Sequence, residues 1–220
     1  MREQTLHKRL TFALQIILII GLVAEIITNQ WFASVLTGFI ILVTFIPLFL
    51  EKKFRVFIPP EFVLLAIAFV FASAFLGIVH GYYDLFWWWD IVLHTASGFL
   101  LGIIGFLLVY ILNEAGTVDL DLKPVFTAFF AFLFALGIGT AWEIFEFSMD
   151  IFFDSGMQTP MLGDPSGLTD TMFDLIVDAL GALVISVTGY SYLKAAKNKS
   201  FLERWIHLFI TKNPQLFRQK

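Results

Sequence analysis

The fold of this chain is decided by an apolar stretch at residues 125–152, VFTAFFAFLFALGIGTAWEIFEFSMDIF. It exceeds the ~20 residues that an α-helix needs to cross a bilayer. Its second half nevertheless carries three carboxylates, Glu143, Glu146 and Asp150. A carboxylate at the centre of a membrane helix costs roughly 2.5–3.5 kcal/mol even on the mildest scale. The stretch therefore predicts a long, tilted or projecting transmembrane helix whose acids need a specific explanation.

The composition extends this prediction to the whole chain. Of its 220 residues 59% are hydrophobic and only 15% are charged, whereas about 25% are charged in soluble domains. The mean hydropathy is +0.84. Apolar runs predict six spans: 10–28, 31–50, 61–80, 91–112, 125–152 and 172–193. The first run is too long for the apolar part of a signal peptide, so we expect it to be retained. The sequence predicts an all-α, polytopic membrane protein with one transmembrane domain at 1–193 and a tail at 194–220.

The distribution of basic residues predicts the orientation. All 14 Lys and Arg residues lie before the first span, between spans two and three, between spans four and five, or after span six. The segments 29–30, 81–90 and 154–170 contain none. Because Lys and Arg accumulate in cytoplasmic loops, both termini are expected inside.

Two segments outside the spans have membrane-surface character. The tail carries an apolar stripe beside basic residues, which predicts an amphipathic helix on the cytoplasmic leaflet; its members are Phe201, Leu202, Trp205, Ile206 and Phe209. The aromatic segment at 80–90, HGYYDLFWWWD, is typical of an interfacial belt. A platform for a sugar or a lipid headgroup is the alternative.

Acidic residues and histidines gather at one predicted depth. Glu143, Glu146 and Asp150 share a face of span five, because steps of three and four residues return to the same side of a helix. The stretch TDTMFDLIVDAL at 169–180 places three aspartates four residues apart. With both termini inside, the acids of spans five and six lie in the outer half of the membrane. Span four begins at the same end.

These residues predict a divalent-metal site, because no Lys or Arg lies on that side to compensate the carboxylates. Asp, Glu and His together suit Mg²⁺, Mn²⁺, Ca²⁺ or Zn²⁺. The expected ligands are His94, Glu143, Glu146, Asp150, Asp174 and Asp178, and further ligands or supporting groups are Glu25, His80, Asp84, Asp90, Asp164 and Asp170. The alternatives are protonated acids bonded across helices, and acids solvated in an outward-facing cavity.

Several chemistries are excluded by the absence of their motifs. The sequence has no cysteine, G-x-S-x-G, H-E-x-x-H or phosphate-binding loop. The segment 154–170 contains turn-forming Gly and Pro residues. We expect it either to connect spans five and six or to cover the site as a lid.

The motifs resemble those of the YjdF-like, DUF2238-type family of uncharacterised bacterial inner-membrane proteins over roughly 60–190. The resemblance rests on Asp90-x-x-x-His94 with Gly98, Trp142-Glu143-x-x-Glu146, and Asp174-x-x-x-Asp178 with Gly181-Ala182. A fainter similarity runs to VanZ-like proteins, which are linked to glycopeptide resistance. This sequence has Glu146 where those proteins usually have Gln, and no Arg follows in the next loop. The resemblance implies a multi-pass protein of the bacterial inner membrane.

Three functions remain compatible with the sequence. The first is a metal-dependent hydrolase or transferase acting on an outer-leaflet lipid or lipid-linked headgroup, with Glu143 and His94 as candidate catalytic groups. The second is a proton- or cation-coupled transporter. The third is a non-catalytic factor, of the resistance type, that binds a lipid headgroup. We expect membrane lipids as partners and no nucleic acid.

Overall fold

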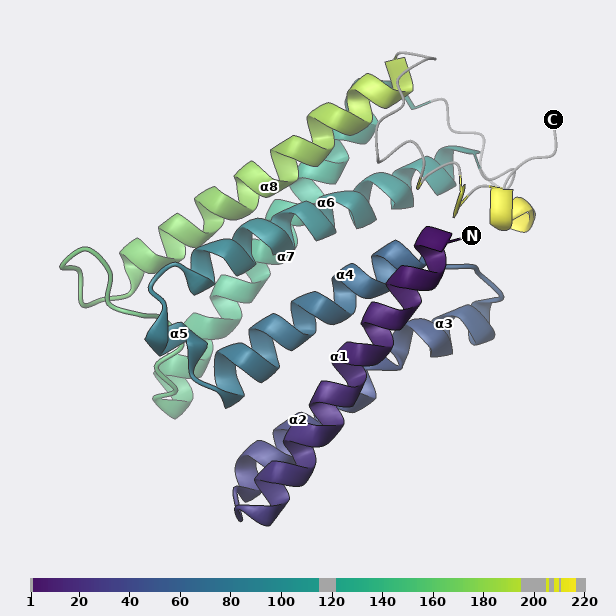
Figure 1. Ribbon diagram of the computed structural model, residues 1–220. Coiled ribbons are helices and arrows are strands. Elements are labelled where there is room, and N and C mark those ends of the chain that lie inside the picture. Colours follow the sequence, from purple (N-terminus) through teal and green to yellow (C-terminus); the bar gives the residue numbers. More distant parts are fainter. Residues whose placement is uncertain (1, 115–121, 195–204, 206–207, 210, 217–220) are drawn as a thin grey trace. The chain divides into compact units, whose positions relative to one another are not determined.

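The computed structural model describes residues 2–114, 122–194, 205, 208–209 and 211–216 (Figure 1). Within these residues the chain is helical and contains no β-strand. The α-helices are α1 (Arg2–Ile27), α2 (Trp31–Thr44), α3 (Ile46–Phe54), α4 (Pro60–Val70), α5 (Tyr82–Leu85), α6 (Trp89–Glu114), α7 (Pro124–Phe153) and α8 (Leu168–Lys194). A π-helix, η1 (Phe71–Val79), continues α4, and a short 3₁₀ helix, η2 (Pro214–Leu216), lies near the C-terminus.

Within the described residues, six helical segments are long and apolar enough to cross a membrane, as the sequence predicts. They are Thr5–Ile27, Trp31–Phe54, Pro60–Val79, Trp89–Asn113, Pro124–Phe153 and Leu168–Lys194. The all-α, six-span fold class is therefore confirmed, and the chain is a multi-pass membrane protein. The orientation of the termini stays a prediction.

Two of the six spans depart from a continuous α-helix. The second span is divided at Phe45, between α2 and α3, where Pro47 cannot donate a backbone N–H. The third span changes from α4 to the π-helix η1. A π-helix loosens the regular α-helical bonding, and here the Ala72 carbonyl accepts a hydrogen bond from the Trp89 indole at 3.3 Å.

The chain forms two compact units, the first of which contains Met1–Trp89 and Leu208–Asn213. Its helices α1 and α2 pack against each other. Between them Thr37 donates to the Glu25 carboxylate at 2.9 Å. The core contains Leu18, Ile40 and Phe75. The Phe75 ring lies against Gly21 of α1, where an added Cβ would collide with it, so this glycine lets η1 approach α1.

Hydrogen bonds of the buried Asn213 side chain connect the segment Leu208–Asn213 to the first unit. The Asn213 amide accepts a hydrogen bond from the Phe57 backbone N–H at 2.6 Å and donates to the Phe57 carbonyl at 2.9 Å. The side-chain amide thus makes both hydrogen bonds that a neighbouring strand would make with Phe57, and it attaches the segment to the connection between α3 and α4. Of the apolar stripe expected in the tail, Phe201, Leu202 and Ile206 lie outside the described residues.

The second unit contains Asp90–His207 and Pro214–Lys220 and is built on α6, α7 and α8. Helices α7 and α8 run side by side (Figure 1). The buried face of each helix carries mainly small residues along one half and acidic residues along the other. Small residues allow membrane helices to approach closely, and the acids are therefore held on the inner faces of a tightly packed unit.

Candidate metal centre

The buried face of α8 carries three aspartates in succession. Asp170, Asp174 and Asp178 are all at most 2% exposed. Their spacing of four residues keeps them on one side of the helix, and the same side continues with Gly181 and Ala182. The aspartates therefore face the neighbouring helices of the unit, as the sequence predicts.

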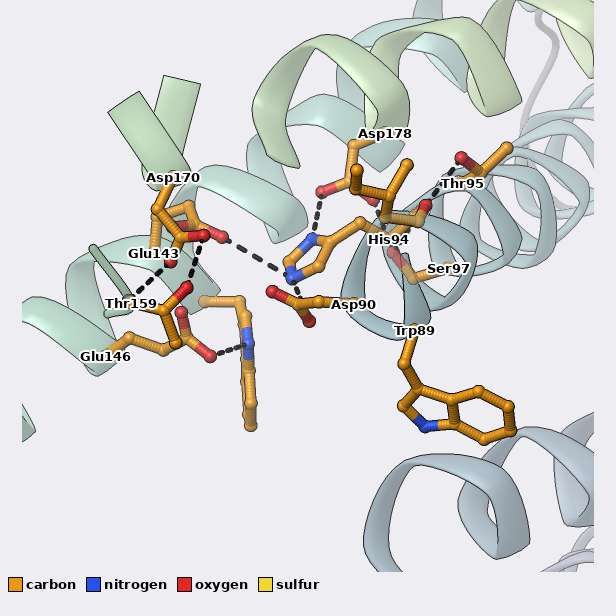
Figure 2. A network of polar contacts seen from close by, with 12 residues as sticks. Trp89, Asp90, His94, Thr95, Ser97, Glu143, Glu146, Thr159, Asp170 and Asp178 are labelled. Atoms are coloured by element: carbon orange, nitrogen blue, oxygen red, sulfur yellow. Dashed lines mark hydrogen bonds and ion pairs between the residues drawn. The ribbon is translucent and has the colours of Figure 1, made fainter. Parts of the chain in front are cut away.

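His94 of α6 lies at the centre of the acidic cluster (Figure 2). Its Nδ1 is 3.3 Å from Oδ2 of Asp178. Its Nε2 is 3.6 Å from Oδ1 of Asp90 and 3.7 Å from Oε1 of Glu143. One imidazole thus connects α6, α7 and α8, and its two nitrogens face different carboxylates.

Two of the buried acids have no hydrogen-bond partner among the described residues. Both oxygens of Asp174 and both oxygens of Glu143 are in this state, and the two side chains belong to residues only 1% and 4% exposed. A buried carboxylate without a partner is unfavourable by at least about 1–3 kcal/mol, and by more when it is charged. The arrangement therefore has acceptor capacity that the described side chains leave unused.

Asp90, His94 and Asp174 form a group that could hold a metal ion. One ligand atom from each residue can be chosen so that all lie within 4.8 Å of one another. Ligands of one ion at about 2.0–2.6 Å from it are separated by no more than about 4–5 Å. Two carboxylates and one imidazole suit Zn²⁺, Mn²⁺ or a harder divalent ion. The donor set and its spacing therefore fit a divalent cation.

The cluster contains no Lys or Arg partner within the described part of the unit. The ion pairs among its described residues all involve His94, with Asp90, Glu143 and Asp178. A single imidazole cannot compensate the ring of carboxylates around it, and like charges at such distances disfavour ionisation of the whole set.

Glu146 is buried beside the cluster and is held by a neighbour on the same helix. The Trp142 indole donates to its Oε1 at 2.8 Å. Since residues four apart lie on one helix face, the sequence pair Trp142–Glu146 encodes this contact locally. Trp142 itself is 47% exposed, so its indole lies between the surrounding lipid and the buried acid.

Three further acids accept hydrogen bonds from the connection between α7 and α8, and two of them belong to the helices themselves. Asp170 accepts hydrogen bonds from the Thr159 N–H and hydroxyl, each at 2.8 Å. Asp150 accepts from the N–H groups of Met157 and Gln158 at 2.7 and 2.8 Å. The connection is therefore tied to both helices by carboxylates. This bonding occupies oxygens that the sequence-based prediction assigned to a metal.

Asp164 lies within this connection and organises its second half. Its carboxylate accepts hydrogen bonds from the hydroxyl and N–H of Ser166 and from those of Thr169. These hydrogen bonds, those from Ser166 first, hold the pKa of Asp164 well below its usual range. Asp164 therefore holds together the turn that leads into the first residues of α8.

Glu25, His80 and Asp84 belong to the first unit. Glu25 accepts its hydrogen bond from Thr37 and leaves Oε2 buried without a partner among the described residues. The His80 Nδ1 lies 2.9 Å from the Phe75 carbonyl, and Asp84 is exposed on α5. The hydrogen bonds described for Glu25 and His80 are thus made within their own unit.

Two features of the centre escape reasoning from the sequence alone. Ser97 donates a short hydrogen bond to Oδ1 of Asp178, and Gly139 leaves space in which the Asp178 carboxylate lies. Ser97 follows His94 by three residues, so their common helix face was the available signal. No pattern in the sequence indicated that Gly139 lies against Asp178.

The fold and the cluster define a multi-pass α-helical membrane protein with a buried Asp/Glu/His centre. The chain belongs to the family described as "Predicted membrane protein (DUF2238)", whose profile matches residues 10–195. It is 28% identical to an uncharacterized protein of Thermotoga maritima over 191 residues. This aligned region covers 86% of the present chain and 91% of the relative. No solved structure matches the chain. Family membership confirms the resemblance seen in the sequence.

Proposed function

We propose that this protein is a divalent-metal-dependent hydrolase or transferase of the bacterial inner membrane. Its substrate is a lipid or lipid-linked headgroup of the outer leaflet. Asp90, His94 and Asp174 hold the metal, and Glu143 serves as general base. The observation that carries the proposal is Asp174, whose two buried oxygens lack hydrogen-bond partners among the described residues although a ligand group with His94 and Asp90 is within reach.

The electrostatics of the cluster support a bound cation. Buried acids crowd around His94, and the described part of the cluster offers no Lys or Arg. Several carboxylates in a low-dielectric site cannot all ionise without compensation. A divalent cation would supply that compensation and use the acceptor capacity of Asp174, whose two oxygens have no hydrogen-bond partner among the described residues.

The positions of the side chains support a division of roles. A bound divalent ion polarises the scissile group and lowers the pKa of a bound water. Glu143 is buried and its Oε1 lies 3.7 Å from the His94 Nε2, so it is placed to accept a proton beside the ligands. The Asp90 side chain is 30% exposed, which makes it the most accessible member of the metal group.

A lipidic substrate is supported by the surroundings of the centre. Ile144, Phe145 and Phe147, next to Glu143 and Glu146 in the chain, are exposed on α7. Apolar side chains exposed on a transmembrane helix face lipid. A substrate with an acyl or prenyl chain therefore reaches the acids from within the bilayer.

The buried faces of α7 and α8 argue against a transport path through this unit. Beyond the acids, the buried side chains of α7 are Gly139, Ala135, Ala131, Ala128 and Thr127, and those of α8 are Gly181, Ala182, Ile185, Ser186 and Gly189. None is ionisable. Ion pathways through membrane helices are usually marked by ionisable residues. The acids are concentrated at one end, as expected for a reaction centre.

The proposal is tested first by metal analysis of the purified, full-length protein in detergent. We expect a divalent ion to co-purify and a chelator to lower the melting temperature. A ligand that binds only the folded state stabilises it by about 2.7 kcal/mol at a hundredfold excess over Kd. Asp174→Asn should lose this response. The matched control is Asp154→Asn, because Asp154 is exposed with φ 52°, a conformation that Asn tolerates.

Absence of a co-purified metal together with an unchanged melting temperature after chelation would remove the basis of the proposal. The enzymatic part is tested separately in vesicles of phosphatidylethanolamine and phosphatidylglycerol, with lipid masses followed after adding the preferred metal. Turnover that Glu143→Gln abolishes, while metal binding persists, supports the assigned base. Metal binding without any turnover of envelope lipids favours the non-catalytic, headgroup-binding alternative.

A further inference from the structure

Asp174 and Asp178 lie one turn apart on α8 but have opposite environments. Both oxygens of Asp174 lack partners among the described residues. Asp178 is fully buried, and both of its oxygens are engaged: Oδ1 accepts the Ser97 hydroxyl, and Oδ2 lies 3.3 Å from the His94 Nδ1. The two aspartates therefore have different roles.

The position of Asp178 is built by glycines on three helices. A Cβ added to Gly98 of α6 would overlap the Asp178 backbone, and one added to Gly139 of α7 would overlap the Asp178 carboxylate. On α8 itself, a Cβ at Gly181 would overlap the backbone at Thr95 of α6. This close approach directs the carboxylate at the His94 ring and leaves it little freedom to turn elsewhere.

The geometry determines which nitrogen of His94 can bind a metal. A neutral imidazole has one N–H donor and one free lone pair. Asp178 accepts at 3.3 Å on the Nδ1 side, whereas the carboxylates of Asp90 and Glu143 lie farther from Nε2, at 3.6 and 3.7 Å. This difference favours a proton on Nδ1 and the lone pair on Nε2. The Nε2 atom faces Asp90 at 3.6 Å, another member of the metal group.

We infer that Asp178 is a positioning residue that fixes the tautomer and the orientation of His94 for coordination through Nε2, and that it is not itself a ligand. This inference rests on the proposed metal site and changes the assignment of Asp178 made from the sequence. Carboxylates that hold the second nitrogen of a ligating histidine orient the ring and raise its basicity, and their loss weakens metal binding 10–100-fold.

Cobalt(II) is a suitable probe, because its absorption spectrum reports the number and kind of ligands. In the full-length protein, Asp178→Asn should raise the Kd for Co²⁺ by about 10–100-fold and leave the spectrum of the saturated site like that of the wild type. Asp174→Asn removes a ligand and should change the spectrum. The control is Ser148→Ala, because the Ser148 hydroxyl donates to the Ile144 carbonyl of its own helix, so its Kd should stay within about threefold of the wild-type value.

A spectrum for Asp178→Asn that changes as it does for Asp174→Asn would make Asp178 a ligand and overturn the inference. An unchanged Kd for Asp178→Asn would also overturn it. If no Co²⁺ binds to the wild type, the proposed metal site has failed, and the tautomer is then tested alone. This separates the two failures.

The tautomer is measured by NMR of nitrogen-labelled histidine in the wild-type protein, with the His94 signals assigned by comparison with His94→Gln. This measurement does not depend on the folding of an Asp178 variant. We expect a proton on Nδ1 in the metal-free neutral form and a metal on Nε2 after addition of Zn²⁺. A proton on Nε2, or coordination through Nδ1, would refute the positioning role.

Discussion

The close contact between α6 and α8 can be tested at Gly98. In Gly98→Ala, the added carbon would lie 2.7 Å from the carbonyl carbon of Asp178 and 2.8 Å from its Cα. Non-bonded carbons are at their optimum at about 3.5–4.0 Å, so the helices must separate by roughly 1 Å. The obstacle is backbone on a packed helix, which cannot rotate away as a side chain could.

The expected destabilisation follows from this overlap. Forcing extra carbon into a packed interior lowers the free energy of unfolding by about 1–3 kcal/mol. The higher helix propensity of alanine offsets at most about 0.5–1 kcal/mol of this effect. Separation of the helices also lengthens the 3.3 Å approach between His94 and Asp178, so metal affinity should fall together with stability.

The assay is unfolding of the full-length protein in mixed detergent micelles, followed by circular dichroism, with metal binding measured by calorimetry. Gly137→Ala is the matched control, because Gly137 is exposed on α7 and its added Cβ meets nothing within 4 Å. We expect this control to be as stable as the wild type or more stable by up to about 1 kcal/mol. Equal stability and equal metal affinity of both variants would refute the reasoning.

Three further predictions concern single contacts. Trp142→Phe removes the indole donor of Glu146 and should lower the free energy of unfolding by about 1–3 kcal/mol, measured by the same detergent titration. The depressed pKa of Asp164 means that its contribution is present above the ordinary value of about 3.9 and is lost as the pH falls through the lower folded-state value. Hydrogen exchange of the α7–α8 connection should therefore stay slow to below pH ~4 in the wild type and be faster at neutral pH in Asp164→Asn. Asn213→Ala removes the partner of the Phe57 backbone, and exchange of the Phe57 amide should accelerate while that of α8 stays unchanged.

The spans were predictable from the sequence because hydrocarbon imposes a simple requirement. Each crossing needs ~20 apolar residues in a helix that satisfies its own backbone, and the six observed segments meet it. The change into the π-helix at Phe71 was not predictable. It is accompanied by contacts of the Phe75 ring with Gly21 and of the Trp89 indole with the Ala72 carbonyl, and hydropathy contains no information about such contacts.

Within the centre, the sequence could identify the face but not the role of each acid. The four-residue spacing placed Asp170, Asp174 and Asp178 together, because helical periodicity alone decides this. Their partners come from elsewhere: Thr159 for Asp170, and Ser97 with His94 for Asp178. Only the packing of three helices distinguishes an aspartate that is fully bonded from one that is left open.

Helix packing alone does not explain why position 174 is an aspartate whose oxygens lack partners among the described residues. Small residues along the α7 and α8 faces would pack as closely with an apolar residue at 174, and an apolar side chain would avoid the desolvation of a carboxylate. Asp178 differs, because its bonds to His94 and Ser97 satisfy it within the protein. A structural role is therefore sufficient for Asp178 as far as stability is concerned, whereas the two oxygens of Asp174 have no hydrogen-bond partner among the described residues. That contrast, between adjacent turns of one helix, is the strongest physical reason to look for a bound cation here.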